Sequence, residues 1–434
     1  MQSTDVTLAF AAALLLSLAV KLWLATRQMR HVAGHRSQVP AAFAATVTLQ
    51  AHQRAADYTL AKGRFGLFSM AFGSLMLLAW TLLGGLEALN SLLIGSVLPA
   101  WGPMAYQLAL LAAFTLIGSL LELPLDAYGT FRIEQRFGFN RMTPKLWLID
   151  LAKGAAVGAL VGLPLAAVIL WIMGASGGLW WLYAWVTWVV FNLALLVLYP
   201  TVIAPMFNKF EPLPDEALKA RVQALMQRCG FAAKGLFVMD GSRRSAHANA
   251  YFTGLGASKR VVFFDTLLQR LSPGEVEAVL AHELGHFKHR HVLQRMVGIF
   301  AFSLGGLALL GWLAGQSGFY AGLGVAPNIG APNDALALLL FMLALPPFTF
   351  FVSPLMAHFS RRHEFQADAY ACQQADGGHL ASALLKLHED NAATLTPDPV
   401  FVRFYYSHPP ASERLAALPA PSVGVLAGTA PAAA

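Results

Sequence analysis

The chain has 434 residues, of which 57% are hydrophobic and only 12% are charged. Soluble domains carry about 25% charged residues, so this composition excludes an ordinary soluble protein and favours a membrane protein. A net charge of +7 would by itself fit nucleic-acid binding. The basic residues are distributed too unevenly for that, however, and we expect a lipid bilayer as partner and no nucleic acid.

Lysine and arginine are missing from three long stretches, residues 65–131, 154–208 and 296–360. Each stretch is long enough for two membrane helices of about 20 residues and a turn. A further apolar run near the N-terminus is interrupted only by Lys21, whose ammonium group can reach the interface. The seven predicted spans are residues 7–26, 66–86, 105–125, 155–174, 179–203, 296–315 and 335–355.

The basic residues between the spans predict the orientation, because loops rich in Lys and Arg stay in the cytoplasm. The loops after spans one and three, the segment 204–295 and everything after residue 356 are expected inside. The turns 87–104, 175–178 and 316–334 hold no basic residue and are expected outside, together with the N-terminus. We expect no cleaved signal peptide, and in a bacterium the protein would lie in the inner membrane.

Residues 282–286 read His-Glu-Leu-Gly-His, an HExxH motif. Residues i and i+4 share one face of a helix, so His282 and His286 can bind the same ion. This pattern is typical of zinc peptidases, in which the carboxylate, here Glu283, takes a proton from water at the ion. We therefore expect one Zn²⁺ per chain. The alternative is a helix that is merely rich in histidine, since two more histidines follow.

A third protein ligand must come from further along the chain, because the residues after His286 do not fit the longer HExxHxxGxxH pattern. Glu364 and Asp368 lie four residues apart on a helix predicted to continue from span seven. Glu364 could reach the metal, and Asp368 could accept a hydrogen bond from a ligating histidine. On spacing alone, an ordinary solvated helix face is an equal alternative, and Glu389 is the next candidate ligand.

The polar block around the motif predicts a mixture of helices and strands. A helix is expected over residues 214–228 and strands over 235–240 and 260–265, and Ser272 is expected to cap the motif helix. We expect that helix to run on towards span six, with the metal roughly 10–15 Å from the hydrocarbon edge by helix rise.

Five segments follow from these patterns. They are a membrane domain with five spans (1–208), a cytoplasmic peptidase segment (209–295), spans six and seven (296–356), the C-terminal part of the peptidase domain (357–416) and a disordered Ala/Pro-rich tail (417–434).

The order and spacing of several short motifs resemble those of the Ste24-type zinc metallopeptidases, the type-one CAAX prenyl protease family. The resemblance covers most of the chain. The motifs lie at residues 58–65, 130–140, 204–210, 244–254, 282–286, 364–368 and 407–410.

This resemblance implies an all-α bundle of seven membrane helices around a chamber, with a zincin-like α+β peptidase domain on the cytoplasmic side. It implies Glu364 as the third zinc ligand. The implied activity is endoproteolysis of membrane-delivered or lipidated peptides, including removal of the last three residues of C-terminally prenylated proteins. A role in membrane protein quality control is equally open.

Further site residues follow from the resemblance alone. Residues 249–251 (Asn249, Ala250 and Tyr251) resemble an edge segment that aligns the substrate backbone, although an ordinary loop is the alternative. His408 could donate a hydrogen bond to the developing oxyanion, supported by Arg414, although it could equally be a structural residue beside prolines. His247 could instead lie behind the metal ligands.

Two rival functions remain at this point. A site-2-type intramembrane protease would embed the motif in an apolar helix, whereas the helix carrying Glu283 has charged flanks. A non-catalytic metal-dependent membrane chaperone or transporter would need metal ligands but no water-activating carboxylate, so Glu283 disfavours it as well.

Overall fold

The computed structural model describes residues 1–232, 235–253 and 259–418. Within them, seven helical segments are long and apolar enough to cross a membrane, which confirms the predicted number of spans. Each predicted span overlaps a different one of these segments. The segments are Ser3–Gly34, Leu49–Trp80, Gly85–Glu134, Pro144–Ala175, Gly177–Phe207, His291–Leu313 and Asp334–Gln374.

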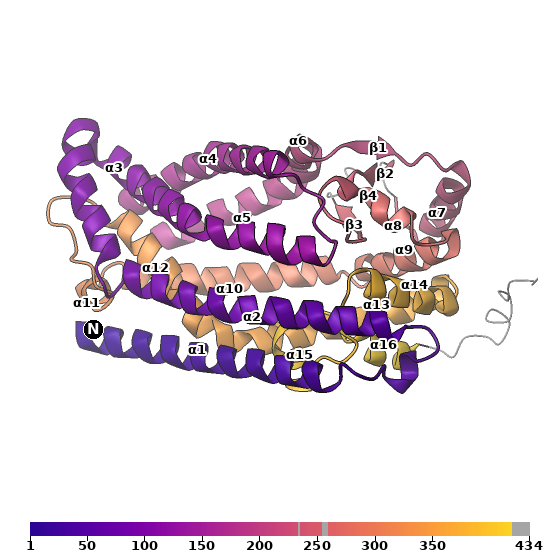
Figure 1. The fold of residues 1–434 in the computed structure, drawn as a ribbon. Coiled ribbons are helices and arrows are strands. Elements are labelled where there is room, and N and C mark those ends of the chain that lie inside the picture. Colours follow the sequence, from indigo (N-terminus) through magenta and orange to yellow (C-terminus); the bar gives the residue numbers. More distant parts are fainter. Residues whose placement is uncertain (233–234, 254–258, 419–434) are drawn as a thin grey trace, which may run out of the picture.

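The long helices lie side by side along the length of the molecule (Figure 1). They are α1 (Ser3–Gly34), α2 (Leu49–Trp80), α3 (Gly85–Tyr128), α4 (Pro144–Ala175), α5 (Trp180–Leu198), α10 (His291–Leu313), α12 (Asp334–Thr349) and α13 (Ser353–Gln374). The shorter helices are α6 (Ala204–Phe207), α7 (Glu216–Arg228), α8 (Asp265–Leu268), α9 (Pro273–Lys288), α11 (Ser317–Gly322), α14 (Gly377–Asp390), α15 (Pro399–Tyr405) and α16 (Ala411–Ala417).

The second span and the turn after it differ from the sequence-based prediction. Helix α2 ends at Trp80, six residues before the predicted end of the span. The next helix, α3, begins at Gly85, so residues 87–104, expected to form a turn, are helical. Two glycines in the left-handed region, Gly84 and Gly102, bound this helical stretch, with φ values of 80° and 79°. Apolar residues between them, including the fully buried Leu86, pack into the core, and this burial favours helix over turn.

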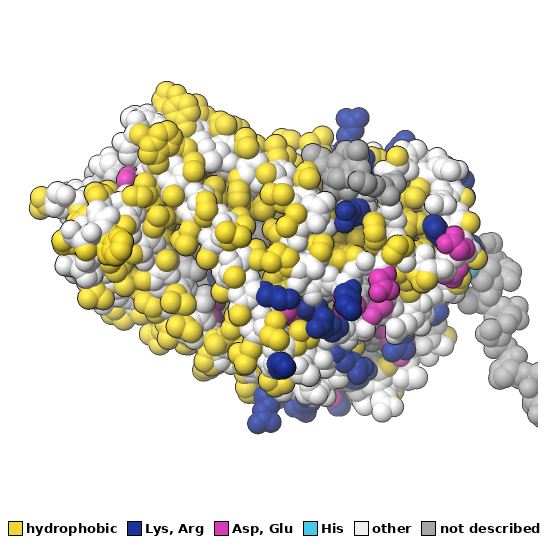
Figure 2. Space-filling view, turned by 90° about the horizontal axis from the view of Figure 1, so that it is seen from above, with side chains coloured by type: hydrophobic (Ala, Val, Ile, Leu, Met, Phe, Trp, Pro, Cys, Tyr) yellow, Lys and Arg dark blue, Asp and Glu magenta, His cyan; other side chains and the backbone are white. Residues whose placement is uncertain are grey.

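Large apolar side chains cover the outside of the bundle. Leu160 and Trp101 are both 77% exposed, and many others are similarly open. Contiguous apolar surface of this kind marks contact with a membrane or a partner. Figure 2 shows Lys and Arg side chains gathered toward the end that holds the sheet, while the rest of that face is largely hydrophobic. The bundle is therefore a multi-pass membrane domain with one polar end.

A four-stranded sheet lies at the polar end (Figure 1). Its strands, in the order β1-β2-β4-β3, are β1 (Phe210–Pro212), β2 (Gly235–Met239), β4 (Arg260–Phe264) and β3 (Ala250–Thr253). Strands β2 and β4 are parallel and match the two strands that were predicted, whereas β1 and β3 pair antiparallel at the two edges. The predicted helix 214–228 is α7, which begins two residues later because Asp215 caps it.

Helix α9 begins as predicted. The Ser272 side chain accepts from the Glu275 backbone N–H, and the Glu275 carboxylate accepts from the Ser272 backbone N–H, which completes a capping box. The end of the helix is a correction, because α9 does not continue into span six. Arg290 adopts a left-handed conformation, with φ of 56°, and α10 starts as a separate helix at His291. The distance to the membrane calculated from a continuous helix therefore does not hold for this helix.

Backbone hydrogen bonds attach the membrane domain to the peptidase end. Arg141 N–H donates to Arg244 O, and Ala246 N–H donates to Phe139 O, both over 3.0 Å. The Arg244 guanidinium also pairs with Asp150 at the start of α4. The division into five segments and the chamber stay predictions, and the expected disordered tail lies outside the described residues from 419 onwards.

Candidate metal centre and active site

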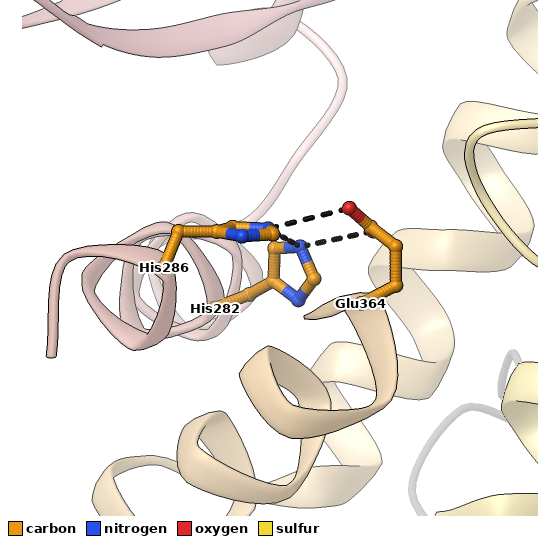
Figure 3. A group of neighbouring side chains, drawn as sticks. All are labelled: His282, His286 and Glu364. Atoms are coloured by element: carbon orange, nitrogen blue, oxygen red, sulfur yellow. Dashed lines mark hydrogen bonds and ion pairs between the residues drawn. The ribbon is translucent and has the colours of Figure 1, made fainter. Parts of the chain in front are cut away.

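Two helices far apart in sequence bring three side chains together (Figure 3). His282 and His286 project from one face of α9, and Glu364 projects from α13, which packs against α9. His282 and Glu364 are buried, and His286 is half-buried. Glu389, the alternative third ligand, is exposed on α14 and does not belong to this group.

The spacing of the three groups fits a tetrahedral ion. The two Nε2 atoms of His282 and His286 are 3.2 Å apart, and they lie 3.4 and 3.3 Å from the oxygens of Glu364. Zinc–ligand bonds of about 2.0–2.1 Å in a tetrahedron imply ligand separations of roughly 3.3 Å. Glu364 Oε2 is buried and has no hydrogen-bond partner within the described residues. A buried carboxylate oxygen without a partner is the kind of atom that a cation would satisfy.

A buried ion pair supports the first histidine from behind. Asp368 Oδ1 lies 2.8 Å from His282 Nδ1, so it can accept the hydrogen bond that leaves Nε2 free for a metal. Arg414 from α16 donates to both oxygens of Asp368, over 2.8 and 2.6 Å. These bonds fix the carboxylate and, through it, the plane of the imidazole ring.

The carboxylates also set the protonation of the metal-free site. Burial alone would lower the pKa of His282, but hydrogen bonds with Asp368 and Glu364 outweigh it and raise the pKa to about 9. Burial raises the pKa of Glu283 above its ordinary value, although the neighbouring His282 and His286 oppose this shift. A carboxyl with a raised pKa is suited to exchange a proton near neutral pH.

His408 lies at the open side of the site. Its Nε2 atom is 3.4 Å from Glu364 Oε1, yet its side chain is 66% exposed, so a bound peptide can reach it. Desolvation lowers the pKa of His408. Arg414 was expected to support His408, but its contacts in the described structure are with Asp368, His282 and Glu364. The structure thus places the Arg414 guanidinium against Asp368, His282 and Glu364 rather than against His408.

The expected substrate-aligning segment coincides with an edge strand. Ala250 and Tyr251 belong to β3, which pairs with β4 and is the edge strand of the sheet among the described residues. Asn249 precedes the strand, is exposed, and accepts from the Ala250 backbone N–H through its own side chain. Strand β3 also contacts α9, so this edge lies near the helix that carries the motif.

His247 has a different environment from the one considered for it. Its ring stacks on Phe139 at 4.3 Å, and its Nδ1 lies 3.0 Å from Asn391 Oδ1. The contact with Phe139 ties the peptidase end to the membrane domain, and neither contact is with His282, His286 or Glu364. Conversely, two residues near the site were missed, His291 and Gln366. In the sequence, the two histidines that follow the motif and the glutamine between Glu364 and Asp368 could have indicated them.

Seven membrane segments, a polar α+β end and an HExxH helix facing a buried glutamate define a multi-pass membrane metalloendopeptidase. Comparisons with known proteins agree. Residues 28–209 match the family described as CAAX prenyl protease N-terminal, five membrane helices, and residues 212–422 match peptidase family M48. The chain belongs to this family, as a Ste24-type member.

The similarity extends over nearly the whole chain. CAAX prenyl protease 1 homologs from Arabidopsis thaliana and Homo sapiens are 33% and 32% identical, covering 88% and 94% of this chain and 90% and 95% of their own lengths. CAAX prenyl protease 1 of Saccharomyces cerevisiae is 34% identical over 83% of this chain and 84% of its own. The crystal structure of S. mikatae Ste24p superposes with a TM-score of 0.89 at 31% identity, covering 95% of this chain and 99% of that one.

Proposed function

We propose that this protein is a zinc-dependent endopeptidase that cleaves C-terminally prenylated or other membrane-delivered peptides. The observation that carries the proposal is the group formed by His282, His286 and Glu364, with separations of 3.2–3.4 Å beside Glu283. Relatives named CAAX prenyl protease 1 support the substrate class.

The residues divide into three roles. His282, His286 and Glu364 would hold the ion, and Asp368 with Arg414 would orient His282. Bound zinc supplies Lewis acidity and lowers the pKa of water to about 7. Glu283 then accepts the proton of the attacking water and passes it to the nitrogen of the departing amine.

His408 and strand β3 would act on the substrate. His408 Nε2–H would donate to the carbonyl oxygen of the scissile bond as negative charge develops on it. The substrate backbone would pair with the free edge of β3, extending the sheet by one strand and laying the scissile bond across α9. Asn249, Ala250 and Tyr251 line the strand that offers this edge.

The position of the site favours substrates that arrive from the membrane. Glu364 lies on α13, which belongs to the seventh membrane segment and follows α12 after only one short 3-10 turn, Phe350–Val352. A peptide with a lipid anchored in the bilayer could therefore reach the metal site. The basic residues at this polar end support a cytoplasmic active site and C-terminus.

The rival functions fit less well. Among the described residues, α9 is not one of the seven apolar segments, which speaks against a site-2-type enzyme. Glu283 at the site, within a peptidase family, speaks against a non-catalytic chaperone or transporter.

Hydrolysis of a quenched prenylated peptide by purified protein in nanodiscs tests the proposal. Glu283→Gln should retain zinc and fold but lose about 10²–10⁴-fold in rate, because the amide cannot accept the proton. His408→Gln should also retain zinc and lose about 10²–10³-fold in kcat. Glu389→Gln is the matched control and should keep full activity. Near wild-type turnover of Glu283→Gln would remove it from the mechanism.

The lipid requirement needs its own comparison. The same peptide without its prenyl group should show a higher KM, because the anchor no longer concentrates it at the membrane. An equal KM for both peptides would leave the peptidase in place but contradict the membrane-delivered substrate.

A further inference from the structure

His291 lies directly behind the second metal-binding histidine. Its Nδ1 atom is 3.0 Å from Nδ1 of His286, and its Nε2 atom is 2.9 Å from Oε1 of Gln366. His291 is 4% exposed, and its ring stacks on His363 at 4.0 Å, with 8° between the ring planes. The ring is therefore held in place on more than one side.

The break between α9 and α10 creates this arrangement. In a helix that continued through Arg290, residue 291 would point to a different side of α9 from His286. The left-handed Arg290 instead makes His291 the first residue of α10, where its ring reaches Gln366 on α13. The same α13 carries Glu364 and Asp368 on either side of Gln366. Two helices thus meet behind His286, as α13 and α16 meet behind His282.

Hydrogen-bond chemistry allows only one direction for this chain of groups. His286 directs Nε2 to the other ligands, so its Nδ1 must carry the proton when Nε2 binds a cation. His291 Nδ1 must then be the acceptor, which leaves the proton of the neutral ring on Nε2. That N–H requires an acceptor, and the Gln366 carbonyl oxygen is one.

We propose that His291 and Gln366 are positioning residues that select the Nδ1–H tautomer of His286 and hold its ring for zinc. This inference rests on the proposed metal site. It gives the two histidine ligands different supports: a charged one for His282, made of Asp368 and Arg414, and a neutral one for His286. The pair His291 and Gln366 adds no further negative charge beside Glu364. It still selects the same Nδ1–H tautomer of His286 that a carboxylate would select.

The test measures zinc affinity of purified full-length protein by competition with a chelator. Gln366→Met keeps the length of the side chain but removes the acceptor, and His291→Phe keeps a ring but removes both nitrogens. Each should weaken zinc binding by about 10–100-fold, the usual effect of losing a group that orients a metal ligand. Gln366→Glu retains an acceptor oxygen and should stay within about threefold of wild type.

His363→Phe is the matched control, since it keeps the stacked ring on His291 and makes no side-chain hydrogen bond within the described residues. It should bind zinc like wild type. Equal affinity of wild type and Gln366→Met would overturn the inference, as would equal losses in Gln366→Met and Gln366→Glu. Absence of zinc from wild type would instead contradict the proposed function, so the two failures are distinguishable. If His291→Phe fails to fold, the pair of Gln366 variants decides.

Discussion

Gly285 of α9 lies against Ala367 of α13 with no room for a side chain between them. A Cβ atom on Gly285 would stand 2.8 Å from Ala367 Cα and 3.0 Å from its carbonyl oxygen. These are backbone atoms, which cannot move aside to relieve a clash as the end of a flexible side chain can. The glycine inside the HExxH motif therefore lets the two helices approach closely enough for Glu364 to meet His282 and His286.

Gly285→Ala is expected to separate the helices and weaken zinc binding at least tenfold while the membrane bundle stays folded. An alanine is otherwise a better helix residue than glycine by about 1 kcal/mol, so any loss must come from the helix contact. Gly298→Ala on α10 is the matched control, since an added Cβ meets nothing within 4 Å in the described structure. Zinc titration of both variants checks this, and equal affinities would contradict the role of the contact.

The third ligand can be tested by metal content. Wild type should hold about one zinc per chain, and Glu364→Gln should lose most of it, because an amide oxygen is a weaker ligand without charge. Glu389→Gln should hold as much zinc as wild type. Elemental analysis after gel filtration measures both. Full occupancy in Glu364→Gln would show that a different group completes the site.

Zinc affinity should rise with pH. In the metal-free site the pKa of His282 is raised to about 9 from 6.5, so at neutral pH zinc must displace a proton. Apparent affinity should increase by up to about tenfold per pH unit and level off near pH 9. Asp368→Asn removes the charge of the carboxylate that is hydrogen-bonded to His282 and should lower the pKa of His282. The rise of zinc affinity with pH should then level off at a lower pH than in wild type. A zinc affinity of wild type that does not change between pH 6.5 and 9 would contradict the raised pKa of His282.

The same shift predicts how the metal-free protein responds to pH. A raised folded-state pKa contributes stability that is fully present below pH 6.5 and lost as the pH rises through about 9. Thermal unfolding in chelator should show a falling melting temperature across this window. The dependence should shrink once zinc is bound, because zinc then occupies Nε2 and His282 no longer changes charge in this range.

The orientation in the membrane can be checked with single cysteines in a background lacking Cys229 and Cys372. A cysteine within 316–333 should react with an impermeant thiol reagent on intact cells, because the loops without basic residues face outward. A cysteine within 141–146 should react only after permeabilisation. The opposite pattern would reverse the proposed sidedness and place the active site outside.

Local patterns in the sequence determined much of this protein. The absence of Lys and Arg over three stretches predicted six of the seven spans, because a charge in the bilayer interior is costly wherever it lies in the fold, and the apolar run near the N-terminus predicted the seventh. The capped start of α9 followed from Ser272, Pro273 and Glu275, since capping involves only neighbouring residues. The spacing of His282 and His286 likewise follows from the helical repeat.

What the sequence could not decide depends on contacts between distant segments. The break at Arg290 and the turn of Arg414 onto Asp368 have no local signature. Spacing alone could not choose Glu364 over a solvated helix face, and only the packing of α13 on α9 brings its carboxylate within 3.4 Å of both histidines. The caps of a helix and the spacing of side chains on one of its faces follow from residues a few positions apart. A metal site instead requires donors that converge in space, and only tertiary packing sets that convergence.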